Sequence, residues 1–126
     1  MLELMLVCSL LAILLLFAIP GYQAYVMRSY RSAAIEALLA AAACQERIYA
    51  SEFEYDTHRC RVQVSDRKYE LHFEPADTGQ LDHFTVTAIP AEAQRGDPCG
   101  NLILDHTGAR GISGPANRLQ KCWEGR

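Results

Sequence analysis

The feature that most constrains the fold is a long apolar segment near the N-terminus. From Leu4 to Met27 the chain carries no charged side chain. As an α-helix this segment is about 36 Å long, at about 1.5 Å per residue. This length is enough to cross a hydrocarbon core of about 30 Å. A cleavable signal peptide is the alternative, but no basic residue precedes the segment and no small-x-small cleavage site follows promptly. We therefore predict a membrane-inserted helix over residues 1–27 and a soluble part over residues 28–126.

The apolar segment is interrupted before it ends. Pro20 and Gly21 are followed by Tyr22 and Tyr25, aromatic residues of the kind found at membrane interfaces. Proline cannot donate a backbone hydrogen bond and clashes with the preceding turn, and glycine adds backbone freedom. We predict a helix break at Pro20 and Gly21, in the form of a kink or a locally melted segment. In the monomer this break need be no more than a bend, since prolines in membrane helices are tolerated, and assembly could extend the segment.

The charges that flank the segment are unusual for a simple anchor. Glu3 stands at its start, where a carboxylate is costly unless it stays at the interface or meets a cation. Arg28 and Arg31 follow the segment and nothing basic precedes it, so the positive-inside rule alone would leave the soluble part in the cytoplasm. The cysteines indicate the opposite side, and we therefore expect a basic leader ahead of Met1.

Four of the five cysteines lie in the soluble part of the chain. Cys8 lies in the apolar segment, where it is expected to behave as a small apolar side chain. The spacing of the other four fits neither a zinc site nor a redox pair. Two disulfides are the interpretation that we favour, and they imply an oxidising compartment; free cytosolic thiols are the alternative. The residues alone allow three pairings among Cys44, Cys60, Cys99 and Cys122.

The soluble part has the pattern of a helix followed by short strands. Small and apolar residues recur at helical spacing up to about Phe53, and three alternating segments follow, at Lys68 to Glu74, His83 to Ile89 and Asn101 to Asp105. A sheet that covers the helix stripe gives a two-layer α+β domain. Residues 109–126 show no periodicity. The predicted helix stripe consists of Ala34, Leu38, Ala41, Cys44 and Ile48, and Asp77 to Gly79 and Thr107-Gly108 are turn signals.

The sequence contains no constellation of residues that indicates catalysis. The four histidines are scattered, and no glycine-rich phosphate loop is present. Three aspartates are conceivable calcium ligands, but their spacing is not that of an EF-hand loop. We therefore expect no enzyme activity, no cofactor and no metal. The histidines are His58, His72, His83 and His106, and the aspartates are Asp56, Asp77 and Asp82.

The N-terminus resembles that of type IVa pilins. The matching features are a glutamate that opens an apolar helix, the sequence Ala-Ile-Pro at Ala18 to Pro20, a Tyr-x-x-Tyr, and then Arg-Ser before an alanine-rich helix. The later segments FTVTAIP and GDPCGNLILDHTGARG and the final CW resemble PilE-like minor pilins. The resemblance covers most of the chain and is weakest between Tyr55 and Asp82. The leader of the family, its glycine cleavage site and the first two mature residues have no counterpart, and Met1 takes the place of the third mature residue.

The resemblance implies a fold and an assembly. The implied fold is the type IV pilin fold, with a long N-terminal helix packed on a small antiparallel sheet and a C-terminal disulfide loop. The family's disulfide loop corresponds to Cys99 and Cys122, which leaves Cys44 and Cys60 as the second pair. In related pilins the glutamate that corresponds to Glu3 pairs with the N-terminal amine of a neighbouring subunit.

The function that the resemblance implies is that of a structural subunit of a type IV pilus, more consistent with a minor than a major subunit. Its implied partners are other pilin subunits, the inner membrane before assembly and the pilus assembly machinery. The domain would be periplasmic before assembly and extracellular afterwards, where the pilus serves adhesion, twitching motility or DNA uptake. A type II secretion pseudopilin and a DNA-binding minor pilin for transformation are alternatives. Candidate DNA or partner contacts are Arg110, Arg118, Lys121 and Trp123, and the other interpretation is a solvated loop whose tryptophan closes the core.

Overall fold

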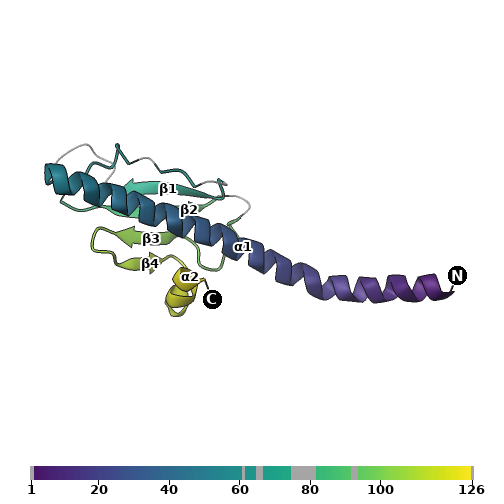
Figure 1. Ribbon diagram of the computed structural model, residues 1–126. Coiled ribbons are helices and arrows are strands. Elements are labelled where there is room, and N and C mark those ends of the chain that lie inside the picture. The colour runs from purple at the N-terminus through teal and green to yellow at the C-terminus, as the bar shows by residue number, and fades with distance from the viewer. Residues whose placement is uncertain (1, 61, 65–66, 75–81, 92–93, 126) are drawn as a thin grey trace.

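The protein consists of one very long helix, a small sheet and a short C-terminal helix (Figure 1). The computed structural model describes residues 2–60, 62–64, 67–74, 82–91 and 94–125. The predicted turn at Asp77 to Gly79 lies outside these ranges. The elements are α1 (Leu2–Glu52), β1 (Tyr69–Glu74), β2 (Thr85–Pro90), β3 (Leu102–Asp105), β4 (Arg110–Ile112), a 3-10 helix η2 (Ala116–Arg118) and α2 (Leu119–Glu124).

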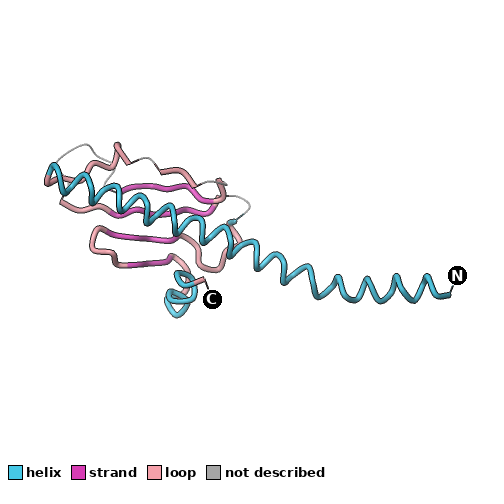
Figure 2. Tube along the Cα trace, viewed as in Figure 1, coloured by secondary structure: helices cyan, strands magenta, loops and turns pink. Residues whose placement is uncertain are grey.

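The sheet is an antiparallel meander that packs against the second half of α1. Its strands follow in the order β1-β2-β3-β4, and each is antiparallel to the next. The helix crosses one face of the sheet and then extends far beyond it towards the N-terminus (Figures 1 and 2). The predicted α+β architecture, with a long helix on a small antiparallel sheet, is confirmed.

The core lies between the helix stripe and the inward face of the sheet. Ala34, Leu38 and Ala41 are fully buried on α1, and Ile48 is nearly so. On the sheet, alternate residues of β2 and β3 point inward, because successive side chains of a strand point to opposite faces. The fully buried sheet residues Val86 and Leu102 therefore face the small side chains of the helix, which allow the two layers to approach closely.

The C-terminal region is more ordered than the sequence analysis expected. Residues 109–126 were expected to lack regular structure, but β4 pairs with β3 and α2 follows it. The expectation was wrong because β4 has only three residues, too few for alternation to be recognised, and α2 has only six. The short helix is ordered by burial of Cys122 and Trp123.

In the single chain, where no more than a bend was expected at Pro20 and Gly21, α1 is continuous, and the break stays a prediction for the filament. The segment Leu2–Glu52 is a single helix with Pro20 inside it, and the residues around Gly21 are helical. The helix bends gradually along its exposed half without interruption (Figure 1). Proline is tolerated here because it removes only one backbone hydrogen bond, and the open surroundings let the helix curve away from the ring.

Candidate functional site

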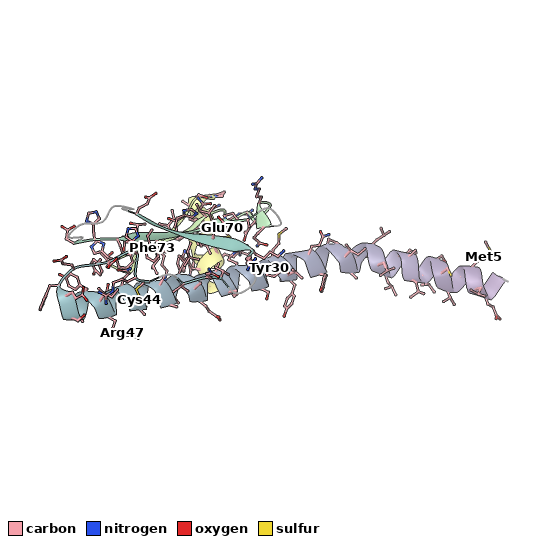
Figure 3. All side chains as sticks on the ribbon, turned by 90° about the horizontal axis from the view of Figure 1, so that it is seen from above. Met5, Tyr30, Cys44, Arg47, Glu70 and Phe73 are labelled. Carbon is pink, nitrogen blue, oxygen red and sulfur yellow. A yellow bond between two sulfur atoms is a disulfide. The ribbon has the colours of Figure 1, made fainter. Side chains whose placement is uncertain are left out.

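The first half of α1 presents a large apolar surface that no described part of the chain covers. Every side chain from Glu3 to Tyr25 is exposed, and Figure 3 shows them projecting freely between Met5 and the domain. Met5, Leu16 and Phe17 are each more than 70% exposed. Among the described residues, α1 is the one helix that is long and apolar enough to cross a membrane. Apolar surface of this extent requires a lipid or protein partner.

The glutamate predicted to act in assembly lies in the first turn of this exposed segment. Glu3 is exposed, and no ion pair links it to another described residue. It has no cationic neighbour in its own apolar segment, because the nearest basic residue along the chain is Arg28. Residues 4–27 therefore cannot supply a cation for Glu3 inside an apolar bundle.

A buried ion pair fixes the point at which α1 enters the domain. Arg31 donates two hydrogen bonds to Asp97, from Nε at 2.9 Å and from Nη2 at 2.5 Å. The side chain of Asp97 is fully buried and that of Arg31 is 10% exposed. Asp97 also accepts bonds from the Tyr69 hydroxyl at 2.7 Å and from the Cys99 amide at 2.9 Å. Gln94 adds a bond to the carbonyl of Met27 at 2.9 Å, so α1, β1 and the segment before β3 are joined at one place.

The hydrogen bonds of this cluster hold Asp97 in its charged form. Burial is the largest single influence and raises the pKa of the carboxyl, but the bonds from Arg31, Cys99 and Tyr69 together lower the pKa below its usual value. The pKa of the Tyr69 hydroxyl is raised, first by burial and then by its bond to Asp97. The cluster is therefore a fully paired ionic site, and its chemistry is structural.

The C-terminal region is closed by a disulfide and by an arginine–tryptophan contact. Cys99 is bonded to Cys122, with 5.9 Å between their Cα atoms. Trp123 donates from Nε1 to the carbonyl of Gly111 at 3.1 Å, and the guanidinium of Arg110 lies 5.1 Å from its ring centre. Trp123 is only 7% exposed. It therefore closes the core beside the disulfide and offers little free surface for stacking on a base.

The two remaining candidate contact residues are exposed on the outside of this region. Arg118 ends η2 and Lys121 lies on α2, and neither forms an ion pair with another described residue. The structure thus divides the predicted contact set. Arg110 and Trp123 contact each other, whereas Arg118 and Lys121 lie together on a separate surface that also faces α1.

The second disulfide braces the other end of α1. Cys44 is bonded to Cys60, with 5.9 Å between their Cα atoms. Beside it the fully buried Gln45 pairs with the backbone of Asp56, donating to its carbonyl at 2.7 Å and accepting from its amide at 3.0 Å. Tyr55 is buried against Phe84 in an edge-to-face contact, with ring centres 4.9 Å apart. The chain after α1 is therefore held to the helix by one covalent and several polar contacts.

Comparison with known proteins identifies the family. A family model described as type IV minor pilin ComP, DNA uptake sequence receptor, matches residues 20–103. The chain belongs to this family. The match includes the second half of α1 and strands β1 and β2, and it ends inside β3. No curated protein matches the chain.

Solved structures show that this minor pilin shares its fold with other pilins. A type IV pilin from Shewanella oneidensis is 28% identical, with a TM-score of 0.58, and the alignment covers 74% of this chain and 96% of that one. The non-core minor pilin PilV of Neisseria meningitidis is 23% identical, with a TM-score of 0.57 and coverage of 74% and 92%, and shows likeness of fold alone. The resemblance inferred from the sequence is confirmed, and the chain is a minor pilin of type IV pili.

Sequence reasoning missed the ionic cluster of this minor pilin. Arg31 was noted only as a charge after the apolar segment, and Asp97 was not singled out. The one signal for it was the position of Arg31, three residues before Ala34 and seven before Leu38, which places it on the buried stripe of the helix. Among the described residues, which exclude Asp77, no group of three or more His, Cys, Asp or Glu side chains could hold a metal ion. His83 contacts Asp82, and His72 lies 3.8 Å from Glu70, both on the exposed surface.

Proposed function

We propose that this minor pilin is anchored in the inner membrane by the first half of α1, with its domain in the periplasm, and then enters an extracellular type IV pilus through the same surface. The observation that carries the proposal is the exposure of every side chain from Glu3 to Tyr25 on one continuous helix. Lipid tails and the helices of other pilin subunits can both cover such a surface. On assembly the helices of neighbouring subunits would replace the lipid. The pilus assembly machinery would catalyse this exchange.

Two disulfides support the proposed compartments. Cys44–Cys60 and Cys99–Cys122 form a set typical of proteins that fold outside the cytoplasm. Because both bonds lie on the C-terminal side of the apolar segment, the domain would occupy the oxidising side of the membrane.

Glu3 would guide docking of the subunit into the filament. An unpaired carboxylate within an apolar bundle costs several kcal/mol, so a growing filament should favour a subunit whose Glu3 meets a cation, such as a neighbour's N-terminal amine. We expect Glu3→Ala to leave the domain folded and to reduce incorporation into sheared pili at least tenfold, because about 1.4 kcal/mol corresponds to a factor of ten. Immunoblots of sheared pili and of membranes measure the two pools.

The matched control is Glu36→Ala, which removes an exposed carboxylate from the same helix within the domain. It should incorporate as the wild type does. Wild-type incorporation of Glu3→Ala would contradict the proposed role of Glu3. Loss of Glu3→Ala from the membrane as well as from the pili would indicate a defect before assembly.

DNA binding is a second candidate function. The matching family model is described as a DNA uptake sequence receptor, and Arg110, Arg118 and Lys121 are exposed basic residues in the C-terminal region. The net charge of −3 limits any attraction to DNA to local basic surfaces, here Arg110 beside Trp123 and the separate pair Arg118 and Lys121. This function would make the pilus a means of DNA uptake, whereas adhesion and twitching motility need no such patch.

The test is fluorescence anisotropy of labelled duplex DNA with the full chain in neutral detergent micelles. Removal of the three charges should weaken binding and reduce the slope of its salt dependence by about one for each phosphate that the variant no longer neutralises. Unchanged DNA binding by the variant R110Q/R118Q/K121Q would exclude these three residues as DNA contacts. Arg47→Gln, at the far end of α1, is the control.

A further inference from the structure

A basic pocket lies where α1 leaves its exposed segment and enters the domain. Its volume is about 180 Å³, and it is lined by four basic residues that come from distant parts of the chain. Arg28 and Arg31 belong to α1, whereas Arg118 and Lys121 belong to η2 and α2. No acidic side chain is among the described residues that line it. A pocket of this size is large enough for a small anionic group together with water.

The pocket has an excess of positive charge that none of the described residues neutralises by an ion pair. Arg31 is paired with the buried Asp97 at 2.5 Å, so the carboxylate of Asp97 neutralises its charge. Arg28, Arg118 and Lys121 are exposed and form no ion pair with any described residue. Three cations around one hollow repel one another, and a bound anion would relieve that repulsion.

The pocket is built by the covalent frame of the domain. Cys99 and Cys122 both line it, and their disulfide holds α2 beside the helix. The Arg31–Asp97 pair and the bond that the Cys99 amide donates to Asp97 fix the opposite wall. The basic groups of α2 are therefore placed opposite those of α1 by bonds that do not depend on the ligand.

The position of the pocket relative to the apolar segment identifies its occupant. Ala24 and Met27, which lie in the last turn of that segment, also line the pocket, and Arg28 directly follows Met27. Tyr22 and Tyr25 are exposed on the same part of the helix, and tyrosine favours the membrane interface. In a membrane-anchored chain the pocket therefore lies at the level of the lipid headgroups.

We propose that this pocket binds the phosphate of an anionic membrane phospholipid. Arg28, Arg118 and Lys121 would surround the phosphate, and Ala24 and Met27 would contact the adjoining lipid. The bound lipid would hold the domain at a defined orientation above the membrane before assembly, and it would be released when neighbouring subunits replace the lipid. This inference rests on the proposed membrane anchoring.

The test uses the full chain, purified in neutral detergent and titrated with phosphatidylglycerol, with retained lipid counted by native mass spectrometry. The wild type should retain one phosphatidylglycerol in preference to phosphatidylcholine. The variant R118Q/K121Q should bind it about thirtyfold more weakly, because each of the two basic residues near an anionic lipid surface contributes about 1 kcal/mol and about 1.4 kcal/mol corresponds to a factor of ten. Reduction of the disulfides, which releases α2, should weaken retention in the same way.

Arg95→Gln is the matched control. Arg95 is exposed, and the residue after it, Gly96, lies beside Met27, where an added Cβ would be 3.7 Å from the Met27 Cε atom. This variant removes one charge from the same end of the domain but outside the pocket, and it should retain lipid as the wild type does. Equal weakening by Arg95→Gln would mean diffuse attraction and would overturn the proposal, as would full retention by R118Q/K121Q.

Two further measurements complete the test. The first distinguishes a lipid phosphate from free phosphate, and the second distinguishes membrane anchoring from lipid binding in the pocket. Inorganic phosphate should not displace the lipid at equal concentration, and displacement would show a site for free phosphate instead. Flotation with pure phosphatidylcholine vesicles tests anchoring alone. A chain that does not float would overturn the anchoring and this inference together, whereas a chain that floats without a preference for phosphatidylglycerol would overturn only the inference.

Discussion

Single buried polar residues determine how the domain is attached to its helix. The Arg31–Asp97 pair is almost completely enclosed, and its two ends lie 66 positions apart in the sequence. Because a buried charge is costly without its partner, the pair enforces one way of seating α1 on the domain. Gln45 has the same role at the other end, where it satisfies the backbone of Asp56.

We expect Asp97→Asn to destabilise the protein by about 3 kcal/mol at neutral pH, because it leaves the Arg31 charge buried without its counter-ion. Adding Arg31→Met should recover part of this loss, since the double variant no longer buries an unpaired charge. Urea unfolding of the full chain in micelles measures both values. Glu36→Gln is the control, and a double variant less stable than Asp97→Asn would contradict the argument.

The same pair predicts a pH dependence. The pKa of Asp97 is lowered in the folded state, so the stabilisation is present above the unfolded value of about 3.9 and is lost as the pH falls through the lower folded value. The urea midpoint of the wild type should therefore fall below about pH 4, and that of Asp97→Asn should fall less. Equal acid sensitivity of the two proteins would show that Asp97 does not control this loss.

Residues of this kind were the least predictable from sequence. Periodicity identified Ala34, Leu38 and Ala41 as the buried stripe, because apolar residues at helical spacing are a direct sign of burial. Spacing also places Arg31 on this stripe, but arginine is rarely buried unless it is paired, so its burial depends on a partner. Its partner, Asp97, lies in an irregular segment, so no local pattern could reveal the pair.

At the scale of elements, the strands with clear alternation were found and the shortest were not. Strands β1, β2 and β3 were predicted within two residues of their ends, whereas β4 and α2 were missed. Both missed elements depend on tertiary contacts: β4 on pairing with β3, and α2 on the disulfide and Trp123. At Pro20 the sequence predicts a break that in the monomer need be no more than a bend, and α1 of the single chain is continuous there.

A break at Pro20 remains a prediction for the assembled filament. Pro20 cannot donate to the carbonyl of Leu16, so this turn is the weakest in the exposed helix. Pro20→Ala should restore that bond and slow amide exchange over residues 16–24 in micelles, because alanine is about 3 kcal/mol more favourable in a helix interior. It should also reduce incorporation into pili if assembly requires this segment to melt.

Gly21→Ala is the matched control for that prediction. An added Cβ at Gly21 meets nothing within 4 Å, so the substitution strengthens the helix by about 1 kcal/mol without supplying the missing hydrogen bond. It should slow exchange less than Pro20→Ala does. Identical exchange in Pro20→Ala and the wild type would show that the proline does not weaken this turn.

At the scale of the whole molecule, the two disulfides secure different regions. Cys44–Cys60 spans 16 positions and ties the end of α1 to the connection that follows. Cys99–Cys122 spans 23 positions and encloses β3, β4 and most of α2. The strand order of the meander makes β4 an edge strand, so its loss would leave the other three strands paired as before.

We therefore expect Cys99→Ser/Cys122→Ser to loosen one region without unfolding the rest. Loop closure of this length is worth roughly 3 kcal/mol in the chain-entropy model, and the remaining contacts of the segment, pairing of β4 with β3 and the bond from Trp123 to Gly111, are non-covalent. Hydrogen exchange should accelerate over residues 110–124, while Leu38, Val86 and Ala88, which are fully buried, stay protected. Emission from Trp123, the single tryptophan, should shift towards that of an exposed ring.

The variant Cys44→Ser/Cys60→Ser supplies the comparison, because it removes a loop of similar length at the opposite end of the domain. Its faster exchange should fall on residues 45–60, and Trp123 should report no change. Uniform acceleration across the domain in both variants would mean that the two bonds stabilise it globally and would contradict regional control. A confined response in the C-terminal variant would show that the region carrying Arg118 and Lys121 can be released from α1 while the helix–sheet core stays folded.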